Sequence, residues 1–505
     1  MALNITEIKN NLFKRKNSGD IANSAQKSEL KKSLRLFDLV VFGVGAIFGS
    51  GIFTIVGVAA AGANGNPGAG PALVLSMIIA VIACILSALC YCEFATMIPS
   101  AGSAYIYAYA TMGEFIAWIV GWLLILEYII GTIAVSIAWS GYLMQLLKGF
   151  EAILPAWVTN PPVWIISDFY TLSQKGSEAI SQVPHLFGTI PFSINLPAIL
   201  IVLTVAFFIT RGTKQSSIIT AIMVGIKIVI ALLFIFTGIF YVNPQNWTPF
   251  APNGIEGIFS GAFIIFFAYI GFDSIATVSE ECKSPKKDLP LGIILSLCVC
   301  TLIYVLIAVV LTGIMPLDKI DLNAPVAYAL RYIGQTKIAG LISFGALAAM
   351  TSVMLVMTIA GTRILYAMSR DNFLPPVFKT LSKRSNTPNI LTWFIAGIII
   401  VGIITTNLSV AADLCNLGTF ASFVIVCSAI IILRKLQPDT PRPFKVPFFP
   451  LVPILGILIC SGLMLISLKN GGMSSYLFLI YMIVGVAFYF AYGYKKIRQE
   501  EKNLK

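Results

Sequence analysis

The stretch VVFGVGAIFGSGIF, residues 40–53, decides the fold because it is hydrophobic enough to enter a membrane and yet rich in glycine. Four glycines, Gly43, Gly45, Gly49 and Gly51, fall within nine residues. Each interior glycine destabilises a helix by about 1 kcal/mol relative to alanine. A membrane segment needs a stable helix to hydrogen bond its backbone groups, so this local loss of helix stability needs an explanation.

The composition identifies a polytopic membrane protein. The chain has 505 residues, of which 58% are hydrophobic and 11% are charged, whereas about 25% of the residues of a soluble domain are charged. Apolar runs recur from residue 38 to residue 494. The first 37 residues are polar and basic with no short apolar core, so we expect no cleaved signal peptide.

The apolar runs predict twelve membrane spans, because about 20 apolar residues are needed to cross the hydrocarbon core. The third and eighth runs are longer than a span needs, so we expect them to tilt or to extend beyond the bilayer. The fourth run is short. The predicted spans are 38–61, 71–96, 114–147, 194–210, 215–241, 257–280, 289–315, 338–367, 389–407, 410–434, 449–468 and 474–494.

The basic residues predict the orientation. With the N-terminus inside, the inner side carries 27 of the 34 lysines and arginines, the outer side carries six, and Lys227 lies within a span. The positive-inside rule then makes both termini cytoplasmic, in a cytoplasmic (inner or plasma) membrane. This topology accounts for the net charge of +12, so nucleic acid is not a predicted partner. The N-terminal tail is expected to be a solvated arm or a weak contact for anionic lipid.

Cysteine and histidine patterns give no sign of a metal, a cofactor or a disulfide framework. The nine cysteines show no C-x-x-C spacing, and His185 is the one histidine. No nucleotide-binding motif is present, so we do not expect ATP-driven pumping. Without a histidine cluster or a sizeable soluble domain, a membrane-embedded enzyme or receptor is also disfavoured. We predict a protein that is not an enzyme and needs no cofactor.

Three charged residues fall deep inside apolar segments: Lys227, Glu127 and Asp273. Lys227 lies about 16–20 Å from either end of its predicted span at a rise of 1.5 Å per residue. Its stem reaches about 6 Å, which is too short to bring the ammonium to the membrane surface. Charges at such depth face a water-filled path or one another.

Two interpretations of these charges remain open. A buried ion pair that fixes helix packing is the structural one. The functional one makes Lys227 a group that gains and loses a proton and thereby influences how the spans are arranged. The acidic pair Glu280 and Glu281, at the end of the sixth span, is instead expected at the interface, as part of an inner gate.

The glycine cluster also has two interpretations. Gly45 and Gly49 fit a small-xxx-small packing seam. A second interrupted segment, GAFIIFFAYIGFDSIA, occurs half a chain later with Gly271 beside aromatic residues and a charge. Interrupted segments at corresponding positions of two halves are typical of a transporter binding site. The two halves would then be spans 1–5 and 6–10, with two spans appended.

Six blocks of sequence carry a resemblance to a known family. The chain resembles the amino acid–polyamine–organocation superfamily, and within it the bacterial relatives of the cationic amino acid transporters, from Ser33 to about Gly471. The blocks are GVGAIFGSGIF, YCEFATMIPSAGSAYIYAY, GWLLILEYIIGTIAVSIAWSGY, FFAYIGFDSIATVSEECKSPKKDLPLGI, TRILYAMSRDNFLPP followed by TPN, and RKLQPDTPRPFKVPFFPLVPILG.

The resemblance implies an all-α fold similar to that of LeuT, with a 5+5 inverted repeat and unwound first and sixth helices. It implies that backbone N–H groups of Ser50 and Gly51 bind the substrate carboxylate, as freed N–H groups at a helix start bind anions. The implied organisation is a tail at 1–37, repeats at 38–241 and 257–434, two further spans at 449–494 and a tail at 495–505. The implied substrate-binding residues are Ile47, Gly49, Ser50, Gly51, Phe267, Ala268, Ile270 and Met350.

The resemblance further implies proton coupling. Lys227 matches a lysine that, in proton-coupled relatives, takes the place of a sodium ion, and a fixed cation repels a second one. Glu127 and Asp273 match acidic positions of the same subgroup. The carbonyls of Ile47, Phe267, Ala268 and Ile270 would hold the substrate ammonium, with the Phe267 ring as a gate.

Substrate preference is predicted from one position. Met350 matches a wall of the side-chain pocket, where it would narrow the pocket and add apolar surface. We therefore expect small or medium neutral L-amino acids, with cationic amino acids bound by Glu127 and Asp273 as the alternative. An uncoupled channel or exchanger is a second alternative. The expected partners are an L-amino acid, protons and the lipid bilayer, and a small accessory membrane subunit is left open.

Overall fold

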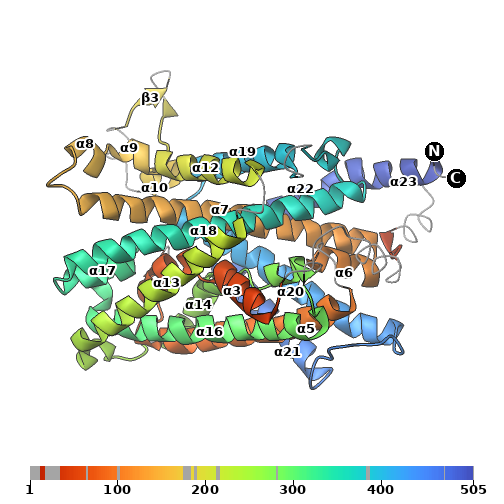
Figure 1. The fold of residues 1–505 in the computed structure, drawn as a ribbon, viewed down its shortest axis with the longest axis horizontal. Helices are drawn as coiled ribbons and strands as arrows, with labels where there is room; N and C mark the ends of the chain where they lie inside the picture. The colour runs from red at the N-terminus through yellow and green to blue at the C-terminus, as the bar shows by residue number, and fades with distance from the viewer. Residues whose placement is uncertain are drawn as a thin grey trace.

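The computed structural model describes residues 12–16, 34–63, 66–98, 103–174, 183–186, 190–211, 216–279, 282–382, 387–470 and 472–503. Within these ranges the chain is almost entirely helical (Figure 1). Most of the long helices run roughly along one axis, α13 crosses them at an angle, and α7 packs along α18 near the middle of the bundle.

Most helices coincide with predicted spans. In chain order they are α3 (Leu36–Ile47) with the π-helix η1 (Gly51–Ile55) and α4 (Val56–Ala61); α5 (Leu73–Met97); α7 (Glu114–Lys148); α12 (Leu196–Arg211); α13 (Ser216–Gly238); α14 (Gly254–Phe266) with the 3-10 helix η6 (Phe267–Tyr269) and α15 (Ser274–Thr277); α16 (Pro285–Ile314); α18 (Thr336–Arg370); α19 (Asn389–Thr405); α20 (Leu408–Leu436); α21 (Leu451–Asn470); and α22 (Met473–Phe488) with the π-helix η10 (Tyr489–Gly493) and α23 (Tyr494–Asn503).

Short elements connect these helices. They are η2 (Gly70–Ala72), α6 (Ser103–Thr111), α8 (Ala156–Thr159), α9 (Val163–Ile166), α10 (Phe169–Gln174), η4 (Ile239–Tyr241), η5 (Pro244–Trp247), η8 (Leu317–Lys319), α17 (Pro325–Tyr332) and η9 (Pro376–Lys379). Two antiparallel hairpins pair β1 (Gly62–Ala63) with β2 (Asn66–Pro67) and β3 (His185–Leu186) with β4 (Ile190–Pro191).

The described residues support a polytopic membrane protein. They contain nine helices that are long and apolar enough to cross a membrane, and ten spans if the bent pair Leu36–Ile47 and Gly51–Ala61 counts as one. The helices α12 and α19 fall at the predicted fourth and ninth spans, but they have only 16 and 17 residues. The count of twelve spans therefore stays a prediction.

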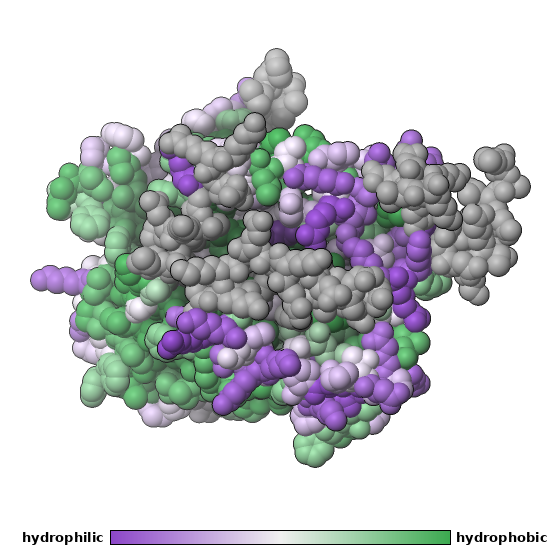
Figure 2. Space-filling model, turned by 45° about the vertical axis from the view of Figure 1, so that its right-hand side comes forward, coloured by the Kyte–Doolittle hydropathy of each residue, from purple (hydrophilic) through white to green (hydrophobic). Residues whose placement is uncertain are grey.

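The surface separates apolar from polar regions, as a membrane protein requires. Large apolar side chains are exposed along α21 and α22, including Leu458 at 61% and Ile483 at 68%. Figure 2 shows hydrophobic residues over much of the left-hand surface and hydrophilic residues gathered at the lower centre and right. A broad exposed apolar surface is the expected consequence of burial in lipid.

The N-terminal segment and the C-terminal helix contact the same end of the bundle. Lys16 forms an ion pair of 2.5 Å with Asp371, which directly follows α18. Arg498 of α23 forms an ion pair of 2.6 Å with Glu114, in the first turn of α7. The segments before the first span and after the sixth also meet, since the Lys283 N–H donates to the Leu34 carbonyl at 2.9 Å.

A buried carboxylate fastens α5 to α20 and to the segment that follows α20. Glu93 has no exposed side-chain surface and accepts hydrogen bonds from Arg434 at 2.5 and 3.0 Å. Arg442 lies 3.2 Å from the same carboxylate, and the backbone N–H of Val446 donates to it at 2.7 Å. Arg434 and Arg442 both pair with the single negative charge of Glu93, so removing that charge leaves both guanidinium groups without this ion pair.

Glu93→Gln is therefore expected to destabilise the protein by about 3–5 kcal/mol, the cost of removing one partner of a buried ion pair. Thermal unfolding of the detergent-solubilised protein measures this as a lower Tm. Glu151→Gln is the matched control, since Glu151 is exposed and the one hydrogen bond of its side chain within the described residues is a 3.4 Å contact from Asn160. A Tm for Glu93→Gln equal to that of the control would contradict the expectation.

Candidate substrate site at two helix interruptions

The first interruption lies inside the glycine-rich stretch. The helix α3 ends at Ile47, and Phe48 leaves helical geometry with ψ at 92°. The chain becomes helical again as a π-helix that begins at Gly51, and the two helical parts are bent by 44°. The interruption is therefore short, and it leaves the carbonyls at the end of α3 and the first N–H groups of η1 without intrahelical partners.

The second interruption lies in the predicted sixth span. The helix α14 continues as the tighter η6, which ends at Tyr269, and the next residue, Ile270, is extended with φ −62° and ψ 142°. Gly271 follows with φ +110°, a conformation that side-chain-bearing residues rarely adopt. The short helix α15 begins at Ser274. The left-handed turn at Gly271 thus separates two helical parts at the predicted position.

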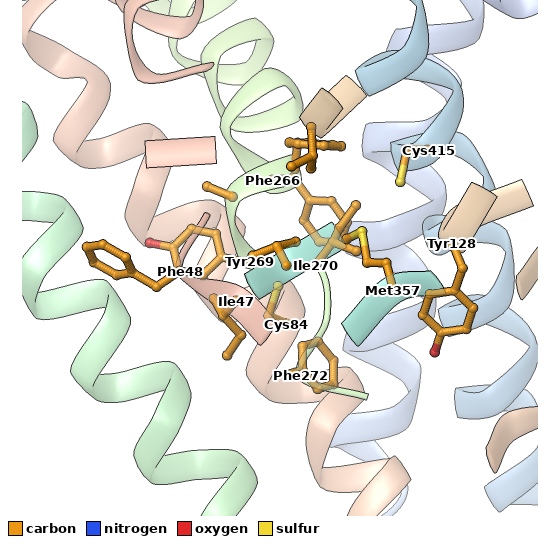
Figure 3. Packing of buried hydrophobic residues seen from close by; sticks show 14 of the residues in the cluster. Ile47, Phe48, Cys84, Tyr128, Phe266, Tyr269, Ile270, Phe272, Met357 and Cys415 are labelled. Atoms are coloured by element: carbon orange, nitrogen blue, oxygen red, sulfur yellow. The ribbon is translucent and has the colours of Figure 1, made fainter. Parts of the chain in front are cut away.

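The two interruptions cross in direct contact. A Cβ atom at Gly51 would overlap the backbone of Ala268, and one at Gly271 would lie 3.1 Å from the carbonyl oxygen of Ala46. Figure 3 shows Ile47 beside Tyr269 and Ile270 at this crossing. Gly51 therefore permits an approach of two backbones that a side chain would prevent, and a side chain at Gly271 would be both strained and crowded.

A tyrosine that the sequence did not single out joins the two interruptions. The hydroxyl of Tyr304, on α16, lies 3.0 Å from the carbonyl oxygen of Ile47 and 3.0 Å from that of Ala268. It is fully buried, and its ring packs against Phe48 and Tyr269. One hydroxyl hydrogen bonds one carbonyl at a time, so both acceptors keep capacity for a further donor.

Lys227 also binds the first interruption. Its Nζ donates to the carbonyl oxygens of Gly45 and Phe48 at 2.7 and 2.8 Å, and to the Ser352 hydroxyl at 3.0 Å. The side chain has no exposed surface. Its three donors thus bind α3, the interruption and α18, and within the described residues it forms no ion pair. The ammonium contributes the positive charge that these carbonyl dipoles attract.

The two predicted acids are linked through Tyr128 and are not among the hydrogen-bond partners of Lys227. Asp273 is 1% exposed and accepts a 2.6 Å hydrogen bond from the Tyr128 hydroxyl. Glu127 is fully buried and directly precedes Tyr128, the residue that binds Asp273. Within the described residues neither acid forms an ion pair, and both Glu127 oxygens lack a hydrogen-bond partner by geometry.

Three further predicted substrate-binding residues, Phe267, Ser50 and Met350, are buried, and the first two lie at the interruptions. Phe267 is 4% exposed as the first residue of η6, and Ser50 is 1% exposed just before η1. Met350 is fully buried on α18, one turn before Val353, whose side chain would lie 2.6 Å from a Cβ at Gly49. Met350 therefore lies on the same face of α18 as Val353. Its contact with a ligand stays a prediction.

The remaining features are the acidic pair at the end of the predicted sixth span and the side chains that could hold a metal ion. Glu280 and Glu281 lie outside the described residues. No group of three or more histidine, cysteine, aspartate or glutamate side chains that could hold a metal ion occurs among the residues that the structure describes.

Comparison with known proteins agrees with a transport function. Residues 34–489 match the model of the amino acid permease family. The chain is 41% identical to the methylthioribose transporter of Bacillus subtilis (strain 168), over 96% of this chain and 98% of the relative. It is 40% identical to the branched-chain amino acid permease BcaP of the same organism, over 97% and 99%. Human cationic amino acid transporter 4 is 33% identical, over 84% and 63%.

Proposed function

This chain belongs to the amino acid permease family, and from that premise we propose that it couples the uptake of a neutral L-amino acid to the entry of protons by alternating access. The observation that carries the proposal is the crossing of the two interrupted helices. Partially charged backbone groups of opposite sign meet there inside the membrane, which suits the two charges of an amino acid. We further propose a LeuT-like 5+5 arrangement with twelve spans.

The substrate carboxylate is assigned to the N–H groups at the start of η1, at Ser50 and Gly51. The substrate ammonium is assigned to the carbonyls of Ile47 and Ala268, which the Tyr304 hydroxyl already holds together in the structure. The Phe267 ring and the carbonyl of Ile270 complete this set. Each assignment uses groups that a helix end leaves available.

A branched aliphatic side chain is the proposed substrate class. The Val353 side chain on α18 lies against Gly49 in the first interruption, and the buried Met350 one turn earlier is assigned as a second source of apolar surface for the substrate side chain. The similarity to a branched-chain amino acid permease along almost the whole chain supports the same class. The relatives named for cationic amino acids are less similar, at 33% or 34% identity.

Proton coupling is assigned to Lys227 together with Glu127 and Asp273. The neutral form of Lys227 carries no charge to attract the carbonyls of Gly45 and Phe48. Release of its proton therefore weakens the tie between the first interruption and α18, which is what a switch between two arrangements needs. The ion pairs of Lys16 and Arg498 at one end of the bundle support a common cytoplasmic side for both termini.

A competition experiment in liposomes tests the substrate class. Uptake of labelled L-isoleucine by the purified protein, under an inward proton gradient, is expected to fall when unlabelled L-valine or L-leucine is added. L-Leucinamide, which has no carboxylate, is the matched control and should not compete. Strong competition by L-arginine and L-lysine without competition by L-valine would replace this proposal by cationic transport, and competition by methylthioribose alone would replace it by sugar transport.

A further inference from the structure

A group of buried polar atoms leads from the acids Glu127 and Asp273 towards one end of the bundle. The hydroxyl oxygens of Tyr91 on α5 and Tyr107 on α6 are buried and, within the described residues, have no hydrogen-bond partner. The same holds for one oxygen of Asp273 and both of Glu127. Such atoms cost about 1–3 kcal/mol each when left unpaired, so five in one region need a common explanation.

These atoms belong to one connected region. The Tyr91 ring packs against Phe272, the residue before Asp273, and Asp273 accepts a 2.6 Å hydrogen bond from Tyr128, the residue after Glu127. The rings of Tyr91 and Tyr107 meet edge to face, with centroids 6.4 Å apart. Aromatic rings enclose them, since Tyr91 also contacts Phe272 and Tyr107 stacks on Phe94 at 4.9 Å.

The region has a direction. Tyr91 is six residues before the end of α5, so it lies about 9 Å from that helix end at 1.5 Å per residue. Tyr107 lies on α6, in the connection between α5 and α7. The hydroxyls therefore lie between the mid-membrane acids and the end of the bundle that carries α6 and the ion pair of Lys16, the end that the basic residues predict to be cytoplasmic.

We propose that Tyr91 and Tyr107 relay the coupled proton between the Glu127–Asp273 pair and the cytoplasmic end of the bundle. This inference rests on the proposed proton coupling and adds the route to it. Each hydroxyl accepts a proton on its oxygen and passes on its own, so each tyrosine is neutral before and after the transfer. Ordered water is the usual partner of such buried groups and completes a relay of this kind.

The other titratable side chains around Glu127 and Asp273 are tyrosines and cysteines, and in their neutral forms these are weaker proton acceptors than a carboxylate. The titratable side chains that interact with this network are Tyr128 on α7, Cys92 on α5, and Cys415 and Cys427 on α20. No lysine or arginine of the described residues forms an ion pair with Glu127 or Asp273. The two carboxyl groups are therefore the proton acceptors from which a relay starts, and Lys227 is not part of it.

Two transport modes of the same reconstituted protein test the relay. Uptake driven by a proton gradient needs net proton movement, whereas exchange of labelled for unlabelled L-isoleucine at equal pH does not. Tyr91→Phe and Tyr107→Phe remove only the hydroxyl and keep the ring contacts. We expect each to lower gradient-driven uptake, and the accompanying acidification reported by a trapped pH dye, by roughly tenfold, while exchange stays near wild type. Proton-transfer groups in enzymes contribute about 10²–10⁴-fold, and water replaces part of that here.

Tyr481→Phe is the matched control, since the Tyr481 hydroxyl donates to the Trp122 carbonyl at 2.7 Å, outside this region. Wild-type gradient-driven uptake in both test variants would overturn the relay. An equal loss of exchange and of gradient-driven uptake would overturn it as well, because the hydroxyls would then serve binding or folding. If wild-type protein shows no response to the gradient but still exchanges isoleucine, the proposed proton coupling itself fails.

Discussion

Lys227→Ala is expected to abolish the response of amino acid uptake to a proton gradient. The variant loses three hydrogen bonds from an ammonium group to Gly45, Phe48 and Ser352. A charge-assisted hydrogen bond contributes about 1.5–3 kcal/mol, and each 1.4 kcal/mol is about tenfold in an equilibrium. The preference for the arrangement seen here should therefore fall by more than about tenfold, and protonation of Glu127 or Asp273 cannot replace the lost hydrogen bonds to Gly45, Phe48 and Ser352.

The measurement is initial uptake of labelled L-isoleucine into liposomes, with and without an inward proton gradient. For Lys227→Ala the two rates should be equal, at a level well below gradient-driven wild type. Lys227→Met keeps much of the side-chain volume and should behave in the same way, which separates the charge from the cavity. Lys337→Ala, at an exposed lysine in the first turn of α18, is the control. A gradient response of wild-type size in both Lys227 variants would remove the role assigned to this lysine.

Gly51→Ala is expected to eliminate substrate binding. The added Cβ would overlap backbone and side-chain atoms of Ala268, which cannot move aside as a flexible side-chain end does. The two interruptions must then separate, and the distance between the carboxylate-binding and ammonium-binding groups changes. Misplacing such groups by about 1 Å costs on the order of 10²-fold in a preorganised site.

Binding is measured as the rise in Tm of purified protein on addition of L-isoleucine, which wild-type protein should show and Gly51→Ala should lack. The matched control is Gly397→Ala on α19, where a Cβ would meet nothing within 4 Å. Gly397→Ala adds the same methyl group as Gly51→Ala, but within a helix and in open space, so it should leave binding unchanged. A ligand-induced Tm rise in Gly51→Ala equal to that of the control would contradict the assigned site.

Several features of this site follow from local patterns in the sequence. The glycine cluster predicts the first interruption because glycine weakens a helix wherever it lies. Gly271 predicts the second in the same way, and its φ of +110° supplies the physical reason for glycine there. Lys227 is recognisable because a charge deep within an apolar run is costly in any arrangement. Each of these signals depends on a residue and its neighbours in the chain.

Other features depend on contacts that no local pattern contains. Tyr304 is one tyrosine in an apolar helix, and only the fold brings its hydroxyl within 3.0 Å of carbonyls from two other segments. Lys227 likewise binds two backbone carbonyls and a hydroxyl, whereas the ion-pair interpretation of its charge required an acidic partner. Tyr91 and Tyr107 become notable only because burial leaves their hydroxyls unpaired among the described residues. Short helices such as α6 and α17 were not predicted, since eight or nine residues carry little periodicity.

Tyr304 connects the binding site to both interruptions and gives the bound state a recognisable geometry. A substrate ammonium that reaches the carbonyls of Ile47 and Ala268 must share these acceptors with the Tyr304 hydroxyl. Both carbonyls can accept two hydrogen bonds, so the tyrosine can stay in place and set the spacing between them.

A structure of the purified protein with its best competing amino acid bound tests the central claim most directly. We expect the ligand at the crossing of the two interruptions, with its carboxylate in hydrogen-bond contact with the N–H groups of Ser50 and Gly51. Its ammonium should contact the carbonyls of Ile47 and Ala268 beside Tyr304. A ligand bound elsewhere in the bundle, or one held at this crossing only through its side chain, would contradict the account.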